Sequence, residues 1–267
     1  MTTQTNKGTA LITGASTGIG AVYADRLARR GYDLILVARD LKKLDMLAAE
    51  LTIKTGRKVA TIKADLSVNN DLREIETRLA NDSCISMLVN NAGLGATKTL
   101  IDSAAADLDS MIILNVLALT RLTRAVAPKL VERGNGTIIN ISSAVALAPE
   151  LLNGTYAGTK SYVLSLTQSL HHEIGGKGVR IQAVMPGAIS TPFWEKAGLP
   201  ITNLPNEIVM TADDLVDAAL AGLDAGELVT IPSLPDVADW SRAEESRLAL
   251  APNLSRSKPA ARYASNV

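Results

Sequence analysis

The stretch LITGASTGIG, residues 11–20, joins a short apolar run to the start of a helical pattern. Gly14, Gly18 and Gly20 permit a tight turn and a close approach of the backbone to a ligand. The start of the following helix offers free N–H groups and the positive end of a dipole, which favours a pyrophosphate. The spacing G-x-x-x-G-x-G matches neither the G-x-G-x-x-G fingerprint nor the ATP-binding loop, G-x-x-x-x-G-K-[ST]. A plain glycine-rich turn is the alternative, but the position directly after a first strand favours a dinucleotide.

Short apolar, β-branched runs alternate with longer amphipathic ones along the whole chain. The runs expected as strands are residues 8–13, 33–38, 58–63, 86–90, 136–141, 179–184 and 227–231, and the helical patterns lie near 19–27, 44–51, 72–79, 107–133, 155–174 and 213–223. The strand runs are nearly continuous, as expected of parallel strands that are buried on both faces. The alternation predicts one α/β domain over residues 1–267, a doubly wound seven-stranded parallel sheet of Rossmann type with helices on both faces.

Two regions depart from this alternation, whose core spans about residues 7–231. Residues 190–210 contain three prolines, the only Phe and a Trp. Long irregular insertions are often lids or binding loops, so we expect a substrate loop here. Residues 250–267 are rich in Pro, Ala, Ser and Arg and form a predicted tail. Disorder of this tail and docking on another subunit both remain open.

The composition argues against several classes of protein. The 27 basic and 27 acidic residues give no net charge, and aromatic residues are scarce, so no nucleic-acid partner is expected. The single cysteine, Cys84, fits a reducing compartment. The polar N-terminus and the lack of 18 consecutive apolar residues predict a cytoplasmic protein without a membrane partner. His171 and His172 have no third ligand at metal spacing, so no metal site is expected.

The second expected strand ends in LVARD. In dinucleotide folds an acidic residue near this point holds the ribose 2′-hydroxyl, whereas a nearby arginine suits a 2′-phosphate. Here Ala38 stands at the acidic position and Arg39 follows it. A guanidinium pairs well with a phosphate, so we predict NADP (as NADPH) in preference to NAD. The alternative is that Arg39 pairs with Asp40 or with solvent.

The stretch YAGTK, residues 156–160, places Tyr156 and Lys160 on one face of a helix. Ser142 and Ser143 end the preceding strand, at the edge where open α/β sheets bind ligands, and Asn115 lies in an apolar helical run. Each feature also has a simpler explanation. Such Tyr/Lys pairs occur by chance, the serines could cap the next helix, and Asn115 could be a satisfied core amide.

Six motifs occur in order: TGASTGIG, NNAG (90–93), Asn115, ISS before YAGTK, YAGTK itself, and PG (186–187) with Thr191. Together they resemble the single-domain branch of the short-chain dehydrogenase/reductase family, over about residues 7–231. LVAR followed by LDMLAAEL is most similar to the NADP-dependent members. One departure, YAGTK where YxASK is commoner, keeps both the tyrosine and the lysine.

The resemblance implies the residues of the site. The catalytic residues are Asn115, Ser143, Tyr156 and Lys160. The cofactor-binding residues are Gly14, Ser16, Thr17, Gly18, Ile19 and Gly20 at the pyrophosphate; Asp65 and Leu66 at the adenine; Asn91, Ala92 and Gly93 at the ribose; and Tyr156, Lys160, Pro186, Gly187, Ile189 and Thr191 at the nicotinamide end, in addition to Arg39. Ser143 is preferred to Ser142 because the family's serine normally lies 13 residues before its tyrosine. The resemblance also implies a homotetramer or homodimer, and a water held by Asn115.

The chemistry expected of this site is the interconversion of a ketone and a secondary alcohol. A phenol of pKa near 10 is a poor acid–base group at neutral pH, and lowering the pKa to about 7 needs roughly 4 kcal/mol. We expect the Lys160 ammonium and the positive nicotinamide ring to contribute this, and Ser143 to bind the substrate oxygen. The apolar loops 144–154 and 192–201 favour a hydrophobic ketone.

Two other functions are weighed against this one. A catalytically silent NADP-binding sensor or scaffold would be expected to lack the tyrosine or the lysine, and both are present. A dehydratase or epimerase usually has a larger region after the sixth strand, whereas about 35 residues separate MPG from ELVTI here.

Overall fold

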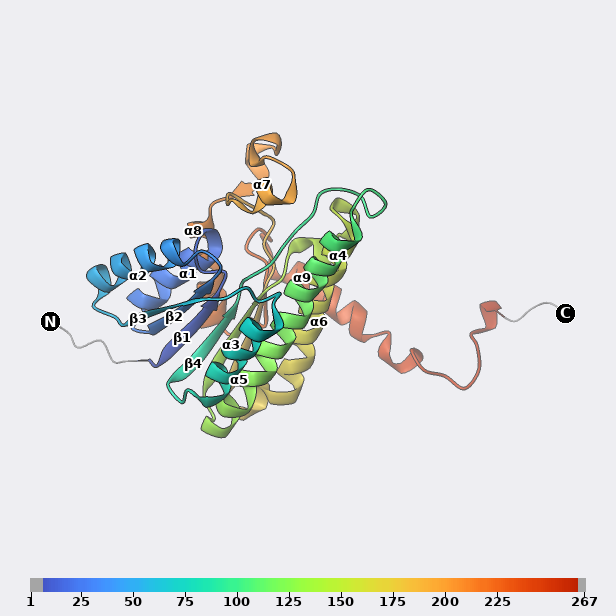
Figure 1. Cartoon of the computed structure of the whole chain (residues 1–267). Coiled ribbons are helices and arrows are strands. Elements are labelled where there is room, and N and C mark those ends of the chain that lie inside the picture. The colour runs from blue at the N-terminus through green and yellow to red at the C-terminus, as the bar shows by residue number, and fades with distance from the viewer. Residues whose placement is uncertain (1–6, 264–267) are drawn as a thin grey trace. The chain divides into compact units, whose positions relative to one another are not determined.

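A computed structural model describes residues 7–263 (Figure 1). Its main sheet has seven strands in the order β3-β2-β1-β4-β5-β6-β9, all parallel. The strands are β1 (Thr9–Thr13), β2 (Asp33–Ala38), β3 (Val59–Lys63), β4 (Ile85–Asn90), β5 (Gly136–Ile141), β6 (Val179–Val184) and β9 (Val229–Thr230). The order reverses between β1 and β4, and ligands of open α/β sheets bind at the carboxyl ends of the strands at such a point. The predicted doubly wound parallel fold is confirmed.

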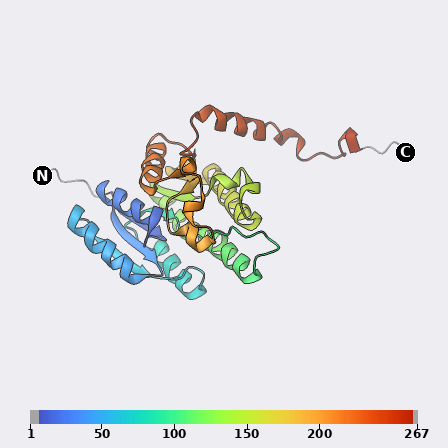
Figure 2. The same ribbon diagram turned by 90° about the horizontal axis from the view of Figure 1, so that it is seen from above.

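Helices cover both faces of this sheet (Figures 1 and 2). One face carries α1 (Gly18–Arg29), α2 (Leu41–Thr55) and α8 (Ala212–Asp224), and the other carries α3 (Asn69–Asn81), α5 (Leu119–Arg133) and α6 (Gly154–Ile174). Successive strand residues point to opposite faces of the sheet. Ala10 and Ile12 pack in the core with α1 and α8, and Leu11 packs in the core with α3 and α5. Burial on both sides explains the continuous apolar runs in the sequence.

The long helical run before β5 is interrupted. It consists of α4 (Ala105–Ile112), a π-helical turn (Ile113–Ala118) and α5, where the sequence pattern predicts one helix over residues 107–133. By length and composition alone, Ala105–Arg133 is the one helix in the described part of the chain that could cross a membrane. Its α5 portion contacts β4, β5 and α3, which is how a core helix of this fold packs. The π turn contains Asn115, and such turns often occur at functional sites.

The segment 190–210 is more regular than the sequence predicts. Strands β7 (Ala188–Ile189) and β8 (Val209–Met210) pair in parallel and enclose the short helix α7 (Phe193–Ala197). The buried indole of Trp194 donates from Nε1 to the Ile189 carbonyl at 2.9 Å, which anchors α7 to β7. Two-residue strands and a five-residue helix are too short to leave a periodic pattern in the sequence.

The chain divides into two compact units, one ending at Pro232 and the other starting at Ser233. This boundary lies before residue 250, where the sequence predicts the tail to begin. The second unit contains a helix, α9 (Val237–Leu248), that the sequence pattern does not predict. None of the residues of α9 is buried.

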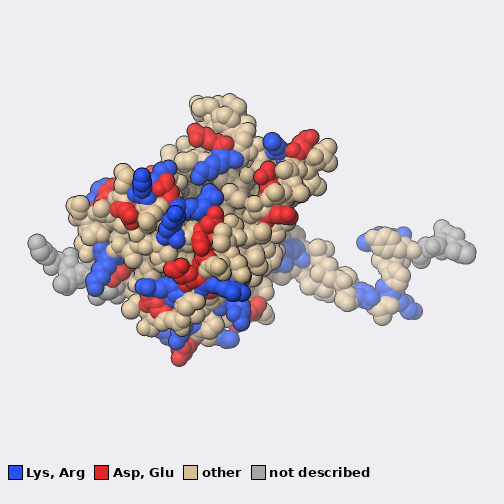
Figure 3. All heavy atoms as spheres, viewed as in Figure 1, with Lys and Arg blue, Asp and Glu red and all other residues tan. Residues whose placement is uncertain are grey.

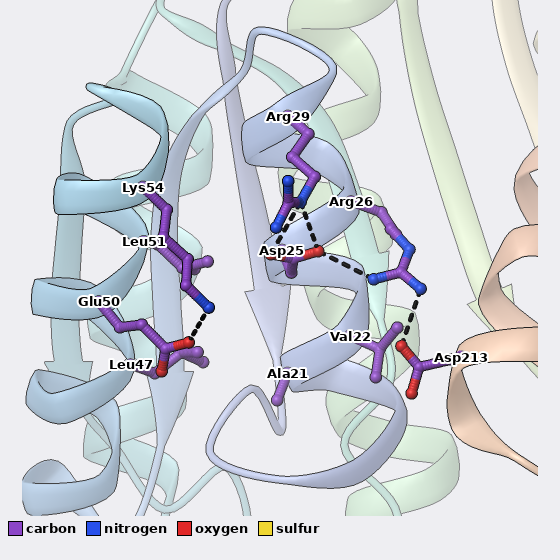
Figure 4. Close-up of a pocket in the computed structure, with 10 residues that line it drawn as sticks. All are labelled: Ala21, Val22, Asp25, Arg26, Arg29, Leu47, Glu50, Leu51, Lys54 and Asp213. Atoms are coloured by element: carbon purple, nitrogen blue, oxygen red, sulfur yellow. Dashed lines mark hydrogen bonds and ion pairs between the residues drawn. The ribbon is translucent and has the colours of Figure 1, made fainter.

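Ion pairs connect α1 to α8 at the surface of the first unit. Arg26 donates from Nε to Asp217 at 2.7 Å, from Nη2 to Asp213 at 2.8 Å and from Nη1 to Asp25 at 2.9 Å. Figure 4 shows this guanidinium between Asp25 and Asp213, at the edge of a shallow depression between α1 and α2. Elsewhere on the face in Figure 3, basic and acidic side chains are interspersed. The hydrogen bond from Arg26 holds the pKa of Asp217 below its ordinary value of 3.8.

Replacing Arg26 by methionine should lower the free energy of unfolding at pH 7 by about 1 kcal/mol, since its partners Asp213 and Asp217 are largely exposed and screened by solvent. A carboxylate with a lowered pKa stabilises the fold above its unfolded value and loses that effect as the pH falls through its folded value. The difference between the variant and the wild type should therefore shrink below pH 3.8. Urea unfolding at pH 7 and pH 3 measures it. Lys54→Met, which removes a pair within α2, is the control, and an equal effect in both variants would contradict the role of Arg26.

Candidate active site

The glycine turn after β1 is held against the end of β4. Gly14 and Gly18 have φ values of +66° and +58°, which favour glycine. The Asn91 side chain donates from Nδ2 to the carbonyls of Thr13 and Gly14, at 2.9 and 3.2 Å. A Cβ on Gly14 would lie 2.8 Å from that nitrogen. The turn therefore has a fixed position that depends on glycine and on Asn91.

The first turn of α1 packs tightly against the glycine turn, and no side chain caps the N-terminal end of this helix within the described chain. A Cβ on Gly20 would come within 2.5 Å of the Gly14 carbonyl oxygen, so α1 begins in direct contact with the turn. Thr17, the residue before α1, provides no side-chain hydrogen bond to the first turn within the described chain. The first backbone N–H groups of a helix have no partner within the helix, so this end is suited to a phosphate. The phosphate site itself stays a prediction.

A single cavity of about 610 Å³ extends from this turn across the carboxyl edge of the sheet. Its lining includes the predicted residues Gly14, Ser16, Thr17, Gly18, Ile19, Arg39, Asp65, Leu66, Asn91, Ala92, Gly93, Ser143, Tyr156, Lys160, Pro186, Gly187, Ile189 and Thr191. Two predicted residues, Gly20 and Asn115, lie behind this lining. The structure thus brings residues from seven separate stretches of sequence to one surface.

One end of the cavity is lined by two basic and two acidic residues, Arg39, Lys43, Asp40 and Asp65. Arg39 follows β2 with its side chain 62% exposed, and its Nη1 lies 3.9 Å from Oδ2 of Asp65. Asp40 instead caps α2, where its Oδ1 accepts a hydrogen bond from Lys43 N at 3.1 Å. Lys43 also lines the cavity, with its Nζ 3.8 Å from Oδ2 of Asp40, and is absent from the residues predicted by sequence. Its position four residues after Arg39, in the first turn of the helix that follows β2, is the signal that could have identified it.

Tyr156 lies in the first turn of α6 beside Ser143. Asn153 caps this helix, accepting from Thr155 N at 2.9 Å and from Tyr156 N at 3.3 Å. Burial raises the pKa of Tyr156 to about 12, and the hydrogen bond with Ser143 opposes that shift. In the protein without cofactor, desolvation therefore exceeds the favourable contacts. The lowered pKa expected from the sequence includes the effect of a bound nicotinamide ring and stays a prediction.

Lys160 is a buried amine one turn further along α6. Its Nζ donates to the Ile141 carbonyl at 2.9 Å and lies 5.8 Å from the centre of the Tyr156 ring. Burial lowers the pKa of Lys160 to about 8. Ser142 donates to the backbone carbonyl of Lys160 at 2.8 Å, so it fixes α6 to the end of β5. Ser143, whose Oγ lies 3.3 Å from the Pro186 carbonyl, is the serine beside the phenol.

Asn115 does not line the cavity but connects two segments that do. Its Oδ1 accepts from Leu94 N at 2.9 Å, and its Nδ2 donates to Leu94 O at 2.8 Å and to Thr159 Oγ1 at 3.1 Å. It therefore fixes the segment after β4 to α6. The water-holding role that the resemblance implies for Asn115 stays a prediction.

The other end of the cavity is apolar. The predicted loops contribute Val145, Leu151, Leu152, Pro192, Phe193, Trp194 and Leu199, and the rest of the predicted substrate loop 190–210 contributes Leu204 and Ile208. Two further lining residues, Leu94 and Gly95, were not predicted. Leu94 and Gly95 directly follow the NNAG motif, which could have indicated them. Within residues 7–263, no group of three or more His, Cys, Asp or Glu side chains is placed to bind a metal ion.

A profile of short chain dehydrogenases matches residues 8–200. The chain belongs to this family. Among curated relatives of this short-chain dehydrogenase, the very-long-chain 3-oxoacyl-CoA reductase of Bos taurus is 36% identical over 198 residues, which are 70% of the chain and 63% of the relative. The chain thus spans less than two thirds of that relative's length.

Solved structures of similar proteins match over nearly their whole length. A short-chain dehydrogenase from Sphingobium yanoikuyae in complex with NADPH has a TM-score of 0.93 and 46% identity, and the match covers 96% of this chain and 99% of that one. The bulky-bulky ketone specific alcohol dehydrogenase from Comamonas testosteroni has a TM-score of 0.90 and 44% identity, covering 98% and 100%.

The buried Lys160 should give the protein a distinctive pH dependence of stability. Between pH 8 and 10.5 the unfolded chain binds a proton that the folded protein does not, so the free energy of unfolding rises with pH. Relative to Lys160→Met, the wild type should gain roughly 3 kcal/mol across this window. Urea unfolding of both proteins at pH 7, 8, 9 and 10 measures the gain. Parallel pH profiles would contradict an ammonium buried at this site.

Proposed function

We propose that this short-chain dehydrogenase is an NADPH-dependent oxidoreductase that reduces a bulky apolar ketone to the secondary alcohol and catalyses the reverse reaction. The observation that carries the proposal is the continuity of one cavity. It connects the end that contains Arg39 and Lys43 with Ser143, Tyr156 and Lys160, and then with an apolar wall. Hydride transfer requires the dinucleotide and the ketone to bind side by side, and one continuous cavity allows this.

The residues present fit a dinucleotide phosphate. A Cβ on Gly18 would lie 3.0 Å from the Thr191 side chain, and one on Gly14 would meet Asn91, so side chains at these positions would crowd the turn. The open first turn of α1 faces this surface and would hold the pyrophosphate. Arg39 and Lys43 would hold a 2′-phosphate, which supports NADPH over NADH. The Sphingobium yanoikuyae relative has NADPH bound, which supports the same choice.

The protein's own groups support proton transfer in the reduction. When bound, the cofactor supplies a hydride to the carbonyl carbon. With a pKa of about 12, the Tyr156 hydroxyl is protonated at neutral pH and can donate to the carbonyl oxygen. Ser143 can hydrogen-bond that oxygen as charge develops on it. Lys160, with a pKa of about 8, is mainly protonated at pH 7 and stabilises the phenolate left behind.

The apolar end of the cavity supports a hydrophobic substrate. Aliphatic and aromatic side chains from 94–95, 145–152 and 193–208 line it. Such walls bind apolar groups by removing their surface from water, at about 25 cal/mol per Å². The alcohol dehydrogenase from Comamonas testosteroni is bulky-bulky ketone specific, and this specificity agrees with the class of substrate proposed here.

Cofactor choice can be tested on the two cations. Replacing Arg39 and Lys43 together by alanine should weaken NADPH binding about tenfold or more, since charged hydrogen bonds contribute about 1.5–3 kcal/mol each. NADH binding should change by less than about threefold. Nicotinamide fluorescence titration measures both dissociation constants. Lys42→Ala, an exposed neighbour of Lys43 that does not line the cavity, is the matched control. Equal losses for NADPH and NADH would contradict the assignment of the phosphate site.

Catalysis can be tested on the phenol. Tyr156→Phe should lower kcat for ketone reduction by about a hundredfold or more, the usual contribution of a general acid. NADPH affinity should change little, because the ring remains. Absorbance of NADPH with a panel of aryl and dialkyl ketones gives the rates, and Tyr162→Phe on the exposed side of α6 is the control. Binding of NADPH without turnover of any ketone by the wild type would instead support a silent cofactor sensor.

A further inference from the structure

The helix α7 is attached to the segment after β4 at two points. Thr97 donates to the Ala197 carbonyl from its backbone nitrogen at 3.2 Å and from Oγ1 at 2.7 Å. The second point is the ring of Phe193, which points at Gly95. Both points lie within the segment 94–98, which immediately follows the NNAG motif and whose first two residues, Leu94 and Gly95, line the cavity.

The Phe193 ring occupies space that any side chain at Gly95 would fill. A Cβ on Gly95 would lie 2.1 Å from Cζ and 2.8 Å from Cε2 of this ring. Atoms cannot approach so closely, so an alanine there must displace the ring. The backbone of Gly95 does not require glycine otherwise, since its φ lies outside the left-handed region. The missing side chain at residue 95 is therefore matched to Phe193 and not to a turn.

The same ring contacts the catalytic tyrosine. Its centre lies 5.9 Å from that of Tyr156 at an interplanar angle of 45°, and 5.7 Å from that of Trp194 at 88°. Trp194 in turn is fixed to β7 through the Ile189 carbonyl. The position of the Phe193 ring thus couples α7 to the wall of the cavity beside the phenol.

We propose that the Phe193 ring packs against Gly95 because this residue has no side chain, and that the contact holds α7 against the segment after β4 and sets the width of the substrate end of the cavity. The effect on which substrates fit rests on the function proposed above, whereas the effect on the position of α7 does not. In this arrangement, substitutions at Phe193 and at Gly95 disturb the same contact, so their effects should not add. Once the ring is removed, a methyl group at residue 95 has nothing left to displace.

A fluorescence cycle tests the contact without any activity. The chain has two tryptophans, Trp194 and Trp240, so Trp240→Phe leaves Trp194 as the sole reporter on α7. In this background Gly95→Ala should raise the acrylamide quenching constant of the buried Trp194 at least twofold, and Phe193→Ala should do the same. Adding Gly95→Ala to Phe193→Ala should produce no further change. An unchanged constant in Gly95→Ala, or effects that multiply in the double variant, would overturn the proposal.

A kinetic cycle tests the effect on the substrate. With NADPH, Gly95→Ala and Phe193→Ala should each raise the ratio of kcat/KM for a bulky diaryl ketone to that for a small methyl ketone at least fivefold, and the double variant should match Phe193→Ala. A ratio that stays at the wild-type value in both single variants would overturn the role in substrate width. If the wild type reduces no ketone, the proposed function fails, and the quenching cycle still decides on the contact.

A matched glycine controls for the added methyl group. Gly176, in the short turn that follows α6, has no heavy atom within 4 Å of a built Cβ, and its φ is not positive. Gly176→Ala should leave the quenching of Trp194 and the ketone ratio at their wild-type values. Equal effects of Gly176→Ala and Gly95→Ala would show a general loosening of the fold and overturn the proposal.

Discussion

The contact between the glycine turn and the ends of β1 and β4 is the constraint on which the site depends. The Thr13 hydroxyl accepts from the backbone nitrogens of Asn91 and Ala92, at 3.0 Å each, while Asn91 holds the carbonyls of Thr13 and Gly14. These bonds join two strands at the point where the strand order reverses. Because the turn carries no side chain at Gly14, the segment after β4 can lie against it, and the cavity starts between them.

The second constraint is a pair of ionisable groups held inside the protein. Burial raises the pKa of Tyr156 and lowers that of Lys160, so both groups favour their neutral forms more than they do in water. Polar contacts hold both groups in place: Lys160 donates to the Ile141 carbonyl, and Tyr156 is hydrogen-bonded to the Ser143 side chain. The buried Asn140 side chain is hydrogen-bonded to Asn90 and Thr167 and so joins β5 to β4 and α6. A bound positive ring beside the phenol would reverse part of the cost of burial.

Much of this arrangement could be predicted from the sequence, because parallel strands buried on both faces give continuous apolar runs. The positions of Gly14, Tyr156 and Lys160 followed from spacing and resemblance. The raised pKa of Tyr156 in the protein without cofactor did not, since it depends on burial. The π turn around Asn115, the strand pair β7–β8 and the apposition of Gly95 and Phe193 arise from contacts between distant segments. No local pattern encodes them.

Hydride tracing is the most direct test of the assignment of this cavity to ketone reduction. The protein would be incubated with NADPH carrying deuterium at the transferable C4 position and with a bulky apolar ketone, and the product would be analysed by mass spectrometry. We expect a secondary alcohol with one deuterium on the carbinol carbon, formed by the wild type and not by Tyr156→Phe. An alcohol without deuterium, or equal formation by the variant, would contradict the assignment.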